Sequence, residues 1–154
     1  MALLTVKGVN YTKAFESNPV QIVDQGMTGG KVKCIMDSYT LPSAVIDVGD
    51  VVKIGAGLLP AGARVVDATI ACASLGDTGI LKLGYAANGV DAADDDAFIA
   101  SADAGGQAVL AKPAAGAAGI FKKLGAATQI VLGCSEISTN NNVEIKVAVF
   151  YVVD

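Results

Sequence analysis

The sequence predicts a mainly β protein built from antiparallel strands, and three observations carry this prediction. Three apolar runs of strand length lie between Val51 and Tyr85, separated by the turn-rich segments LLPAGA and LGDTG. Apolar and polar residues alternate within most of the runs, which is the period of a half-buried strand. The apolar share is 53% with aromatics at only 5%, so we expect a core of small and β-branched side chains.

Residues 1–30 are predicted to form an N-terminal arm, followed by a single β-domain over residues 31–154. Short apolar stretches alternate in the arm with polar residues, Pro19 and the turn cluster Gly26–Gly30. Such an arm packs along the edge of its own sheet or reaches onto a neighbouring subunit, and the sequence leaves both arrangements open. A chain of 154 residues is long enough to bury one core without disulfides or metals.

The first predicted strand runs from Lys31 to Tyr39. Alternation gives it a polar and an apolar face, with Lys31, Lys33 and Ile35 on one side and Val32, Cys34 and Met36 on the other. We expect the apolar face to pack against the core.

The Val51–Tyr85 stretch is predicted to hold three consecutive antiparallel strands. Its connector Leu59–Gly62 places Pro at the second position and Gly at the fourth, the arrangement that a type I turn prefers. We therefore expect a hairpin-like reversal there, followed by strands over Arg64–Ala73 and Ile80–Tyr85.

One short helix is predicted near residues 94–104. The acidic run Asp91–Asp96 precedes the apolar segment Ala97–Ala100, and carboxylates at a helix start accept hydrogen bonds from free N–H groups and favour the positive end of the dipole. Gly105 and Gly106 lie where the helix would stop.

The last third of the chain is predicted to contain an exposed loop and a closing hairpin. Residues 104–119 are rich in Ala and Gly, so we expect a loop around a short strand at Val109 and Leu110. Strands over Thr128–Cys134 and Val143–Val153 would form the hairpin. The second half of the final strand is apolar on both faces, which predicts burial in the core or against a partner chain.

Composition disfavours several classes of function. The net charge is −4 and only 17% of residues are charged, whereas nucleic-acid binders carry a basic excess that neutralises phosphates. No apolar run reaches the length of a membrane helix, and the first residues lack the basic region of a secretory signal, so folding in a cytoplasm is expected. An apolar chain with so few charges favours an oligomer or a component of an assembly.

No set of residues predicts catalysis or a cofactor. The chain has no His, and Cys34, Cys72 and Cys134 lie far apart in apolar runs, so we expect buried reduced thiols. The one dense carboxylate group is a candidate calcium site, formed by Asp91, Asp94, Asp95 and Asp96. Its spacing lacks the Gly and Glu of an EF-hand loop, so helix capping is the preferred interpretation.

Three segments within Val51–Asp103 read LPAGARVVDA, LGDTGILKLGYAA and DDDAFIASAD. In this order they resemble small virion proteins of tailed bacteriophages, in particular head decoration or cement proteins. The resemblance implies a β-sandwich or jelly-roll-like domain, commonly a homotrimer. It also implies that the subunit binds the outside of the major capsid protein shell, in a virion assembled in the host cytoplasm. No contact residue is defined by these motifs.

Two alternatives from other classes stay open. A phage tail or fibre component would use the same kind of β-sandwich trimer. A lectin-like jelly roll could hold calcium and a sugar in the loops around Asp91–Asp96. The absence of Trp and the scarcity of aromatic rings argue against a sugar site, because such sites usually lay a ring on the sugar face.

Overall fold

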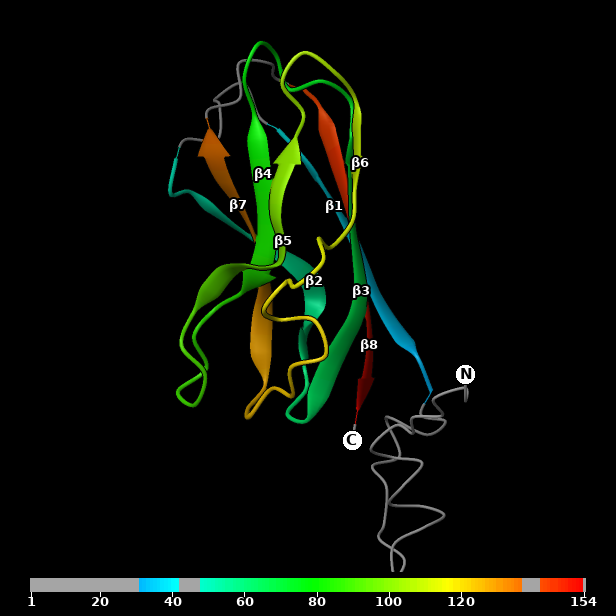
Figure 1. Ribbon diagram of the computed structural model, residues 1–154, viewed down its shortest axis with the longest axis vertical. Helices are drawn as coiled ribbons and strands as arrows, with labels where there is room; N and C mark the ends of the chain where they lie inside the picture. The colour runs from blue at the N-terminus through cyan, green and yellow to red at the C-terminus, as the bar shows by residue number, and fades with distance from the viewer. Residues whose placement is uncertain (1–30, 42–47, 137–141, 154) are drawn as a thin grey trace, which may run out of the picture.

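The computed structural model describes residues 31–41, 48–136 and 142–153 of the chain, and these residues form eight strands and no helix (Figure 1). The predicted arm at 1–30 lies outside the described residues. The strands are β1 (Lys33–Thr40), β2 (Val51–Leu59), β3 (Ala63–Cys72), β4 (Ile80–Tyr85), β5 (Asp94–Asp103), β6 (Val109–Ala111), β7 (Thr128–Glu136) and β8 (Glu144–Val153).

The strands form two four-stranded antiparallel sheets that pack against each other. Sheet A has the order β1-β8-β3-β6, and sheet B has the order β2-β7-β4-β5. Strands from the two ends of the sequence pair with each other, and the pairing continues toward the middle of the sequence: β1 pairs with β8, β2 with β7, β3 with β6 and β4 with β5. The prediction of a mainly β antiparallel protein is confirmed.

Consecutive strands mostly cross between the sheets, so the hairpin expected at Leu59–Gly62 is wrong. Strand β2 lies in sheet B and β3 in sheet A, and the connector is a corner of the sandwich. The turn itself sits one residue later than predicted, because the Ala63 N–H donates to the Pro60 carbonyl at 3.1 Å. Gly62 has φ of 80°, which suits the third position of a type II turn and not a type I turn. Leu59 and Ala63 are fully buried, which anchors both ends of the corner in the core.

The predicted closing hairpin is wrong for the same reason. Strand β7 belongs to sheet B and β8 to sheet A, and the predicted turn at 138–142 lies almost entirely outside the described residues. Within the described chain, β4 and β5 are the consecutive strands that pair directly. The double-sided burial expected for the end of the last strand is confirmed, because Tyr151 and Val152 are both buried on neighbouring positions of β8.

The helix predicted near 94–104 is also wrong, because these residues form strand β5. Its middle residues Ala97, Phe98 and Ile99 are buried, and the strand pairs with β4 through two register shifts. A close backbone approach makes this pairing possible: a Cβ added at Gly84 would lie 2.0 Å from the Asp94 carbonyl oxygen. Pairing and burial therefore override the helical preference of an Ala-rich segment that follows acidic residues.

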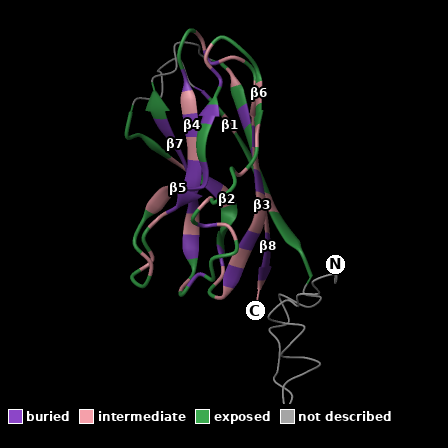
Figure 2. Ribbon diagram, in the orientation of Figure 1, coloured by how far each residue is buried: buried purple, intermediate pink, exposed green. Residues whose placement is uncertain are grey.

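The core lies between the two sheets, and Figure 2 shows buried segments on strands of both. Its largest side chains are Tyr85 and Phe98, whose ring centroids lie 5.8 Å apart in a tilted arrangement. The remaining fully buried large side chains are aliphatic: Leu41, Ile54, Leu59, Ile70, Leu75, Leu81, Leu83, Ile99, Ile130 and Leu132. The core differs in part from the small and β-branched side chains expected from composition, because more of these aliphatic residues are Leu than Ile.

Candidate functional site and contact surfaces

Three connections meet at one end of the sandwich, which we call the loop end: the corner 60–62, the loop 86–93 and the loop 112–127 (Figure 1). Backbone hydrogen bonds join the corner to the last of these loops. The Gly62 N–H donates to the Leu124 carbonyl at 2.8 Å, and the Leu124 N–H donates to the Ala63 carbonyl at 2.9 Å. The corner and the loop 112–127 therefore form one continuous surface.

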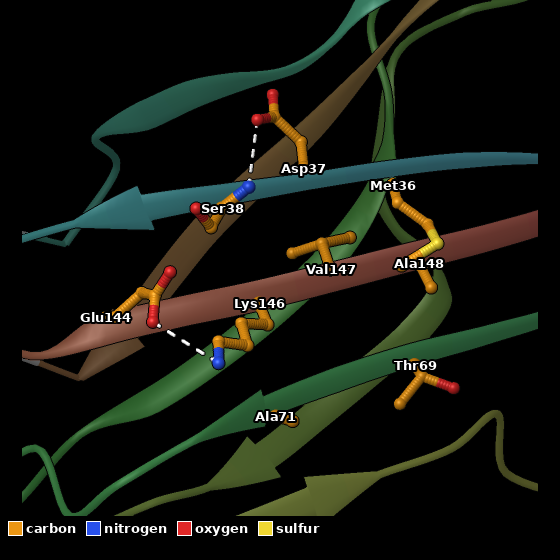
Figure 3. Close-up of a pocket in the computed structure, with 9 residues that line it drawn as sticks. All are labelled: Met36, Asp37, Ser38, Thr69, Ala71, Glu144, Lys146, Val147 and Ala148. Atoms are coloured by element: carbon orange, nitrogen blue, oxygen red, sulfur yellow. Dashed lines mark hydrogen bonds and ion pairs between the residues drawn. The ribbon is translucent and has the colours of Figure 1, made fainter.

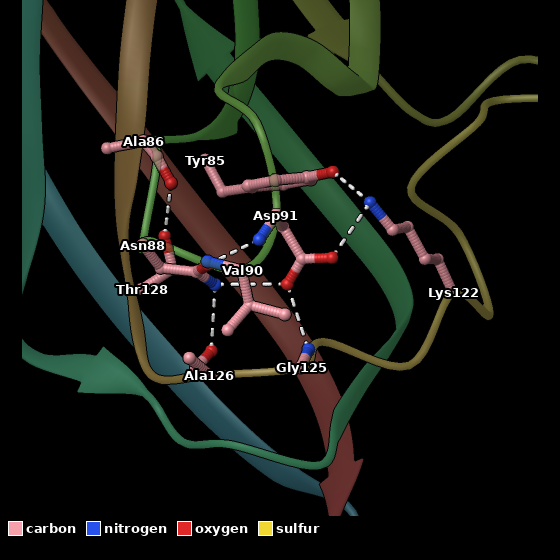
Figure 4. Close-up of polar contacts among 9 residues, drawn as sticks. All are labelled: Tyr85, Ala86, Asn88, Val90, Asp91, Lys122, Gly125, Ala126 and Thr128. Carbon is pink, nitrogen blue, oxygen red and sulfur yellow. Dashed lines mark hydrogen bonds and ion pairs between the residues drawn. The ribbon is translucent and has the colours of Figure 1, made fainter.

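Asp91 joins the loop 86–93 to the loop 112–127 (Figure 4). One carboxylate oxygen accepts hydrogen bonds from the Asn88 side chain at 3.0 Å and from the Gly125 N–H at 2.8 Å. The other oxygen lies 3.3 Å from the Lys122 ammonium. These contacts stabilise the carboxylate, so the pKa of Asp91 falls below its usual range, with the Asn88 hydrogen bond as the largest cause.

Lys122 completes the network by contacting a core residue. Its ammonium donates to the Tyr85 hydroxyl at 2.6 Å and lies 5.0 Å from the centroid of the same ring. The pKa of Lys122 is raised, first by the hydrogen bond to Tyr85 and then by Asp91. Because Tyr85 is 1% exposed, this lysine anchors the loop to the core.

The structure separates the four acidic residues that formed the calcium candidate. Asp91 contacts Lys122, and Asp95 forms an ion pair with Lys82 at 2.7 Å. Asp94 and Asp96 lie near each other, and partial burial, followed by the hydrogen bond and charge of Asp96, raises the pKa of Asp94. Among the described residues no group of three or more Cys, Asp or Glu side chains is arranged to hold a metal ion. Helix capping does not occur either, because the acidic run leads into a strand.

The three cysteines differ in exposure, and all are free thiols. Cys134 is buried as predicted, but Cys72 is half-buried and Cys34 is exposed, so the prediction of buried thiols is wrong for Cys34. Burial raises the pKa of the Cys72 thiol.

The outer face of sheet A carries a shallow hollow of about 430 Å³ (Figure 3). Its floor consists of small side chains, Thr69, Ala71 and Ala148, from the two central strands. Met36 from β1 lines one side and is 75% exposed. An ion pair between Glu144 and Lys146 at 3.4 Å closes one end. Apolar atoms on the outside of a sandwich sheet are unusual, because this face normally carries polar residues.

Sheet B covers its own outer face. Lys82 extends over Gly133, where an added Cβ would lie 3.0 Å from the Lys82 Cε atom, and its ammonium pairs with Asp95. The Gln129 side chain donates to the Ile54 carbonyl at 2.6 Å. The two outer faces both carry ion pairs, Lys82–Asp95 on sheet B and Glu144–Lys146 on sheet A, and sheet A differs by its hollow with a floor of small side chains.

Strand β1 turns its predicted apolar face outwards, which is a second correction to the sequence analysis. Val32 and Met36 are 60% and 75% exposed, whereas Ile35 packs against the core. Burial accounts for this orientation, because Ile35, Tyr39 and Leu41 lie on the face that packs toward the core. The Asp37 carboxylate lies on the same face and accepts a hydrogen bond from the Gly55 N–H of β2 at 2.7 Å. The sequence contains one signal for this orientation. Ile35, Tyr39 and Leu41 occupy alternate positions along the chain together with Asp37, so all four lie on the same face.

Comparison with known proteins shows the fold. No protein-family model matches the chain, and no curated protein sequence matches it significantly. Three solved structures share the fold. A chain titled "Cyanophage Pam1 capsid asymmetric unit" is 19% identical with a TM-score of 0.66, over 92% of this chain and 99% of that chain. A chain of the "Capsid of Ralstonia phage GP4" is 21% identical with a TM-score of 0.60, over 81% and 86%. A chain of the "Acidic stable capsid structure of Helicobacter pylori bacteriophage KHP30" is 14% identical with a TM-score of 0.50, over 79% and 87%.

The described residues include no helix that is long and apolar enough to cross a membrane.

Proposed function

We propose that this protein is a structural subunit of a bacteriophage virion without catalytic activity, and that it decorates or cements the head by binding outside the major capsid protein shell. The observation that carries the proposal is the match over 92% of this chain and 99% of a chain from a phage capsid asymmetric unit. The match extends over nearly the full length of that capsid chain and is not confined to one domain of a larger shell protein.

We infer in addition that the sandwich is a jelly roll. The strand orders β1-β8-β3-β6 and β2-β7-β4-β5, with pairing from the outside of the chain inwards, support this inference. Eight-stranded double-sheet jelly rolls are common in viral capsid domains.

The surfaces support a role in assembly. A decoration subunit stabilises a shell by binding across assembled subunits in preference to free ones. The outer face of sheet A offers apolar surface that a partner can bury. The hydrogen-bonded loops of the loop end offer a second contact surface, which is already ordered before binding. We assign residues 1–30 to an arm that clamps a neighbouring subunit, which would add contacts without enlarging the β-domain.

Co-sedimentation with shells tests the proposal. The purified chain is mixed with heads of its own phage from which it is absent, and we expect saturable binding and a higher melting temperature of the shell. Met36→Lys should weaken binding if sheet A faces the shell, whereas Lys53→Ala on the edge of sheet B should not. A chain that stays in the supernatant at all concentrations contradicts a decoration role.

A tail or fibre role is separated from a head role by the same assay. Purified tails replace the heads, and binding to tails alone would move the proposal from the capsid to the tail.

A further inference from the structure

The sandwich has four sheet edges, and three of them are protected against pairing with another chain. Strand β6 has only three residues. Strand β5 has two register shifts, and the Gly119 N–H donates to its Ala97 carbonyl at 2.8 Å. Strand β2 is irregular between Ile54 and Leu59, and Asp37 accepts its Gly55 N–H. Short length, irregular register and covering contacts are the usual devices that block edge pairing.

Strand β1 is longer than β6 and more regular than β2 and β5. Its covering contacts within the described part of the chain are limited to Asp37, whose carboxylate accepts the Ser38 N–H at 2.8 Å and the Gly55 N–H at 2.7 Å. Its register against β8 is continuous over eight residues, from Lys33 opposite Tyr151 to Thr40 opposite Glu144. The strand contains neither Pro nor Gly, and all its residues except Ile35 and Tyr39 are exposed. No other described strand pairs with its free side. A long, regular and exposed edge is a template for a further strand.

We propose that β1 pairs antiparallel with β1 of a second copy of this chain, around a two-fold axis at Ile35. The register follows from charge and polarity. With Ile35 opposite Ile35, each Lys33 faces Asp37 of the other copy, which forms two cross-strand pairs of opposite charge. The Asp37 carboxylate keeps its hydrogen bonds from the Gly55 and Ser38 N–H groups, and the Lys33 ammonium adds a third contact to it. On the outer face, each Cys34 lies opposite Met36, so the exposed apolar residues of the two copies meet.

Neighbouring registers fit less well. Centring the axis on Met36 places Ile35 opposite Asp37 and removes both charge pairs. Centring it on Cys34 leaves only Lys33–Ile35 of each strand paired within the bounds of β1. Centring it on Asp37 sets two carboxylates against each other, which is unfavourable.

The contact joins two copies of sheet A into one continuous sheet through an isologous interface. It also extends the apolar outer face across both copies. The inference concerns only pairing between copies, so it stands or falls independently of binding to a shell.

Disulfide trapping tests the register. Residues directly opposite in an antiparallel pair have Cα atoms about 4.5–5.5 Å apart, within the range that a disulfide spans. In Met36→Cys, the new thiol faces Cys34 of the other copy. We expect mild oxidation of the full chain to give a covalent dimer as the main species on a non-reducing gel. The double variant Cys34→Ser/Met36→Cys should stay monomeric on the same gel.

Ser38→Cys is the matched control, because it places a thiol on the same exposed face but opposite Val32 of the other copy. It should not cross-link. Equal cross-linking of Ser38→Cys, or no dimer with Met36→Cys, overturns the proposal. The second outcome is expected if residues 1–30 of the same chain cover the edge. A dimer of the unaltered chain through Cys34 alone overturns this register.

A charge reversal gives an independent measurement. Lys33→Glu sets two carboxylate pairs against each other, so we expect the dimer dissociation constant in analytical ultracentrifugation to rise about tenfold at low salt. Lys53→Glu, on an exposed position of β2, is the control and should leave it unchanged. An unchanged constant for Lys33→Glu contradicts the proposed charge pairing.

Discussion

Single residues at the loop end decide how the protein responds to acid. The pKa of Asp91 is lowered in the folded chain, so its stabilising contribution is present above the ordinary pKa of an aspartate, about 4, and is lost as pH falls through the folded value. The pKa of Asp94 is raised, so its contribution has the opposite sign: it favours the folded state as pH falls and is lost as pH rises through the folded value.

We therefore expect Asp91→Asn and Asp94→Asn to shift stability in opposite directions near neutral pH. Asp91→Asn should lower the thermal midpoint, because Lys122 loses its charged partner, and the difference from the unaltered chain should shrink below pH 4. Asp94→Asn should raise the midpoint, because it removes a partly buried charge beside Asp96. Melting curves from pH 3 to pH 7 check both, with Asp103→Asn as the control on the same strand. Equal shifts in one direction would contradict the assigned contacts.

The calcium hypothesis is tested at the same residues. Asp91 and Asp95 already contact lysines, so we expect titration calorimetry with millimolar calcium to show no saturable heat. A saturable heat that disappears in Asp94→Asn/Asp96→Asn would establish a calcium site and reopen the ligand-binding interpretation.

Gly84 is the residue on which the β4–β5 pairing depends. Gly84→Ala should lower the free energy of unfolding by at least about 3 kcal/mol, because its Cβ would overlap the backbone of Asp94 and Asp95. Gly57→Ala is the matched control: no atom lies within 4 Å of its added Cβ, so a change within about 0.5 kcal/mol is expected. Urea denaturation measures both. Equal effects would show that β5 does not approach Gly84.

At the scale of elements, β5 shows why local sequence signals were insufficient. Acidic residues before an Ala-rich segment are typical of a helix start, but Ala97, Phe98 and Ile99 bury their side chains in the core as part of a strand. Strand β1 shows the same limit in another form. Its alternation was visible in the sequence, but the packing of Ile35, Tyr39 and Leu41 against the core determined which face points inwards.

Burial of Phe98 gives a direct test of how β5 packs onto the core. Phe98→Ala should lower the free energy of unfolding by about 3–5 kcal/mol, because the ring is fully buried against Tyr85. Leu110→Ala, on the outer side of β6 and 70% exposed, should change it by less than about 0.5 kcal/mol. A small effect of Phe98→Ala would contradict the packing of β5 onto the core.

At the scale of the whole molecule, the homotrimer that the phage resemblance implies is the property to measure first, separately from the two-fold pairing of β1. Native mass spectrometry of the 15.4 kDa chain should show a trimer if the decoration or fibre proposals hold. A monomer at micromolar concentration would contradict the trimer and leave the pairing of β1 to be judged by its own cross-linking test. If the Met36→Lys variant still forms a trimer, the trimer interface lies away from the outer face of sheet A.

The sequence by itself determined the chemical character of the protein: antiparallel strands, a largely aliphatic core with few aromatic rings, and a chain without His. These properties follow from composition and from the two-residue period, both of which are local. Only the tertiary structure decided which strands pair, since β1 meets β8 and β2 meets β7 across most of the chain. Such contacts depend on how both sheets bury their inner faces together, and no short segment carries that information.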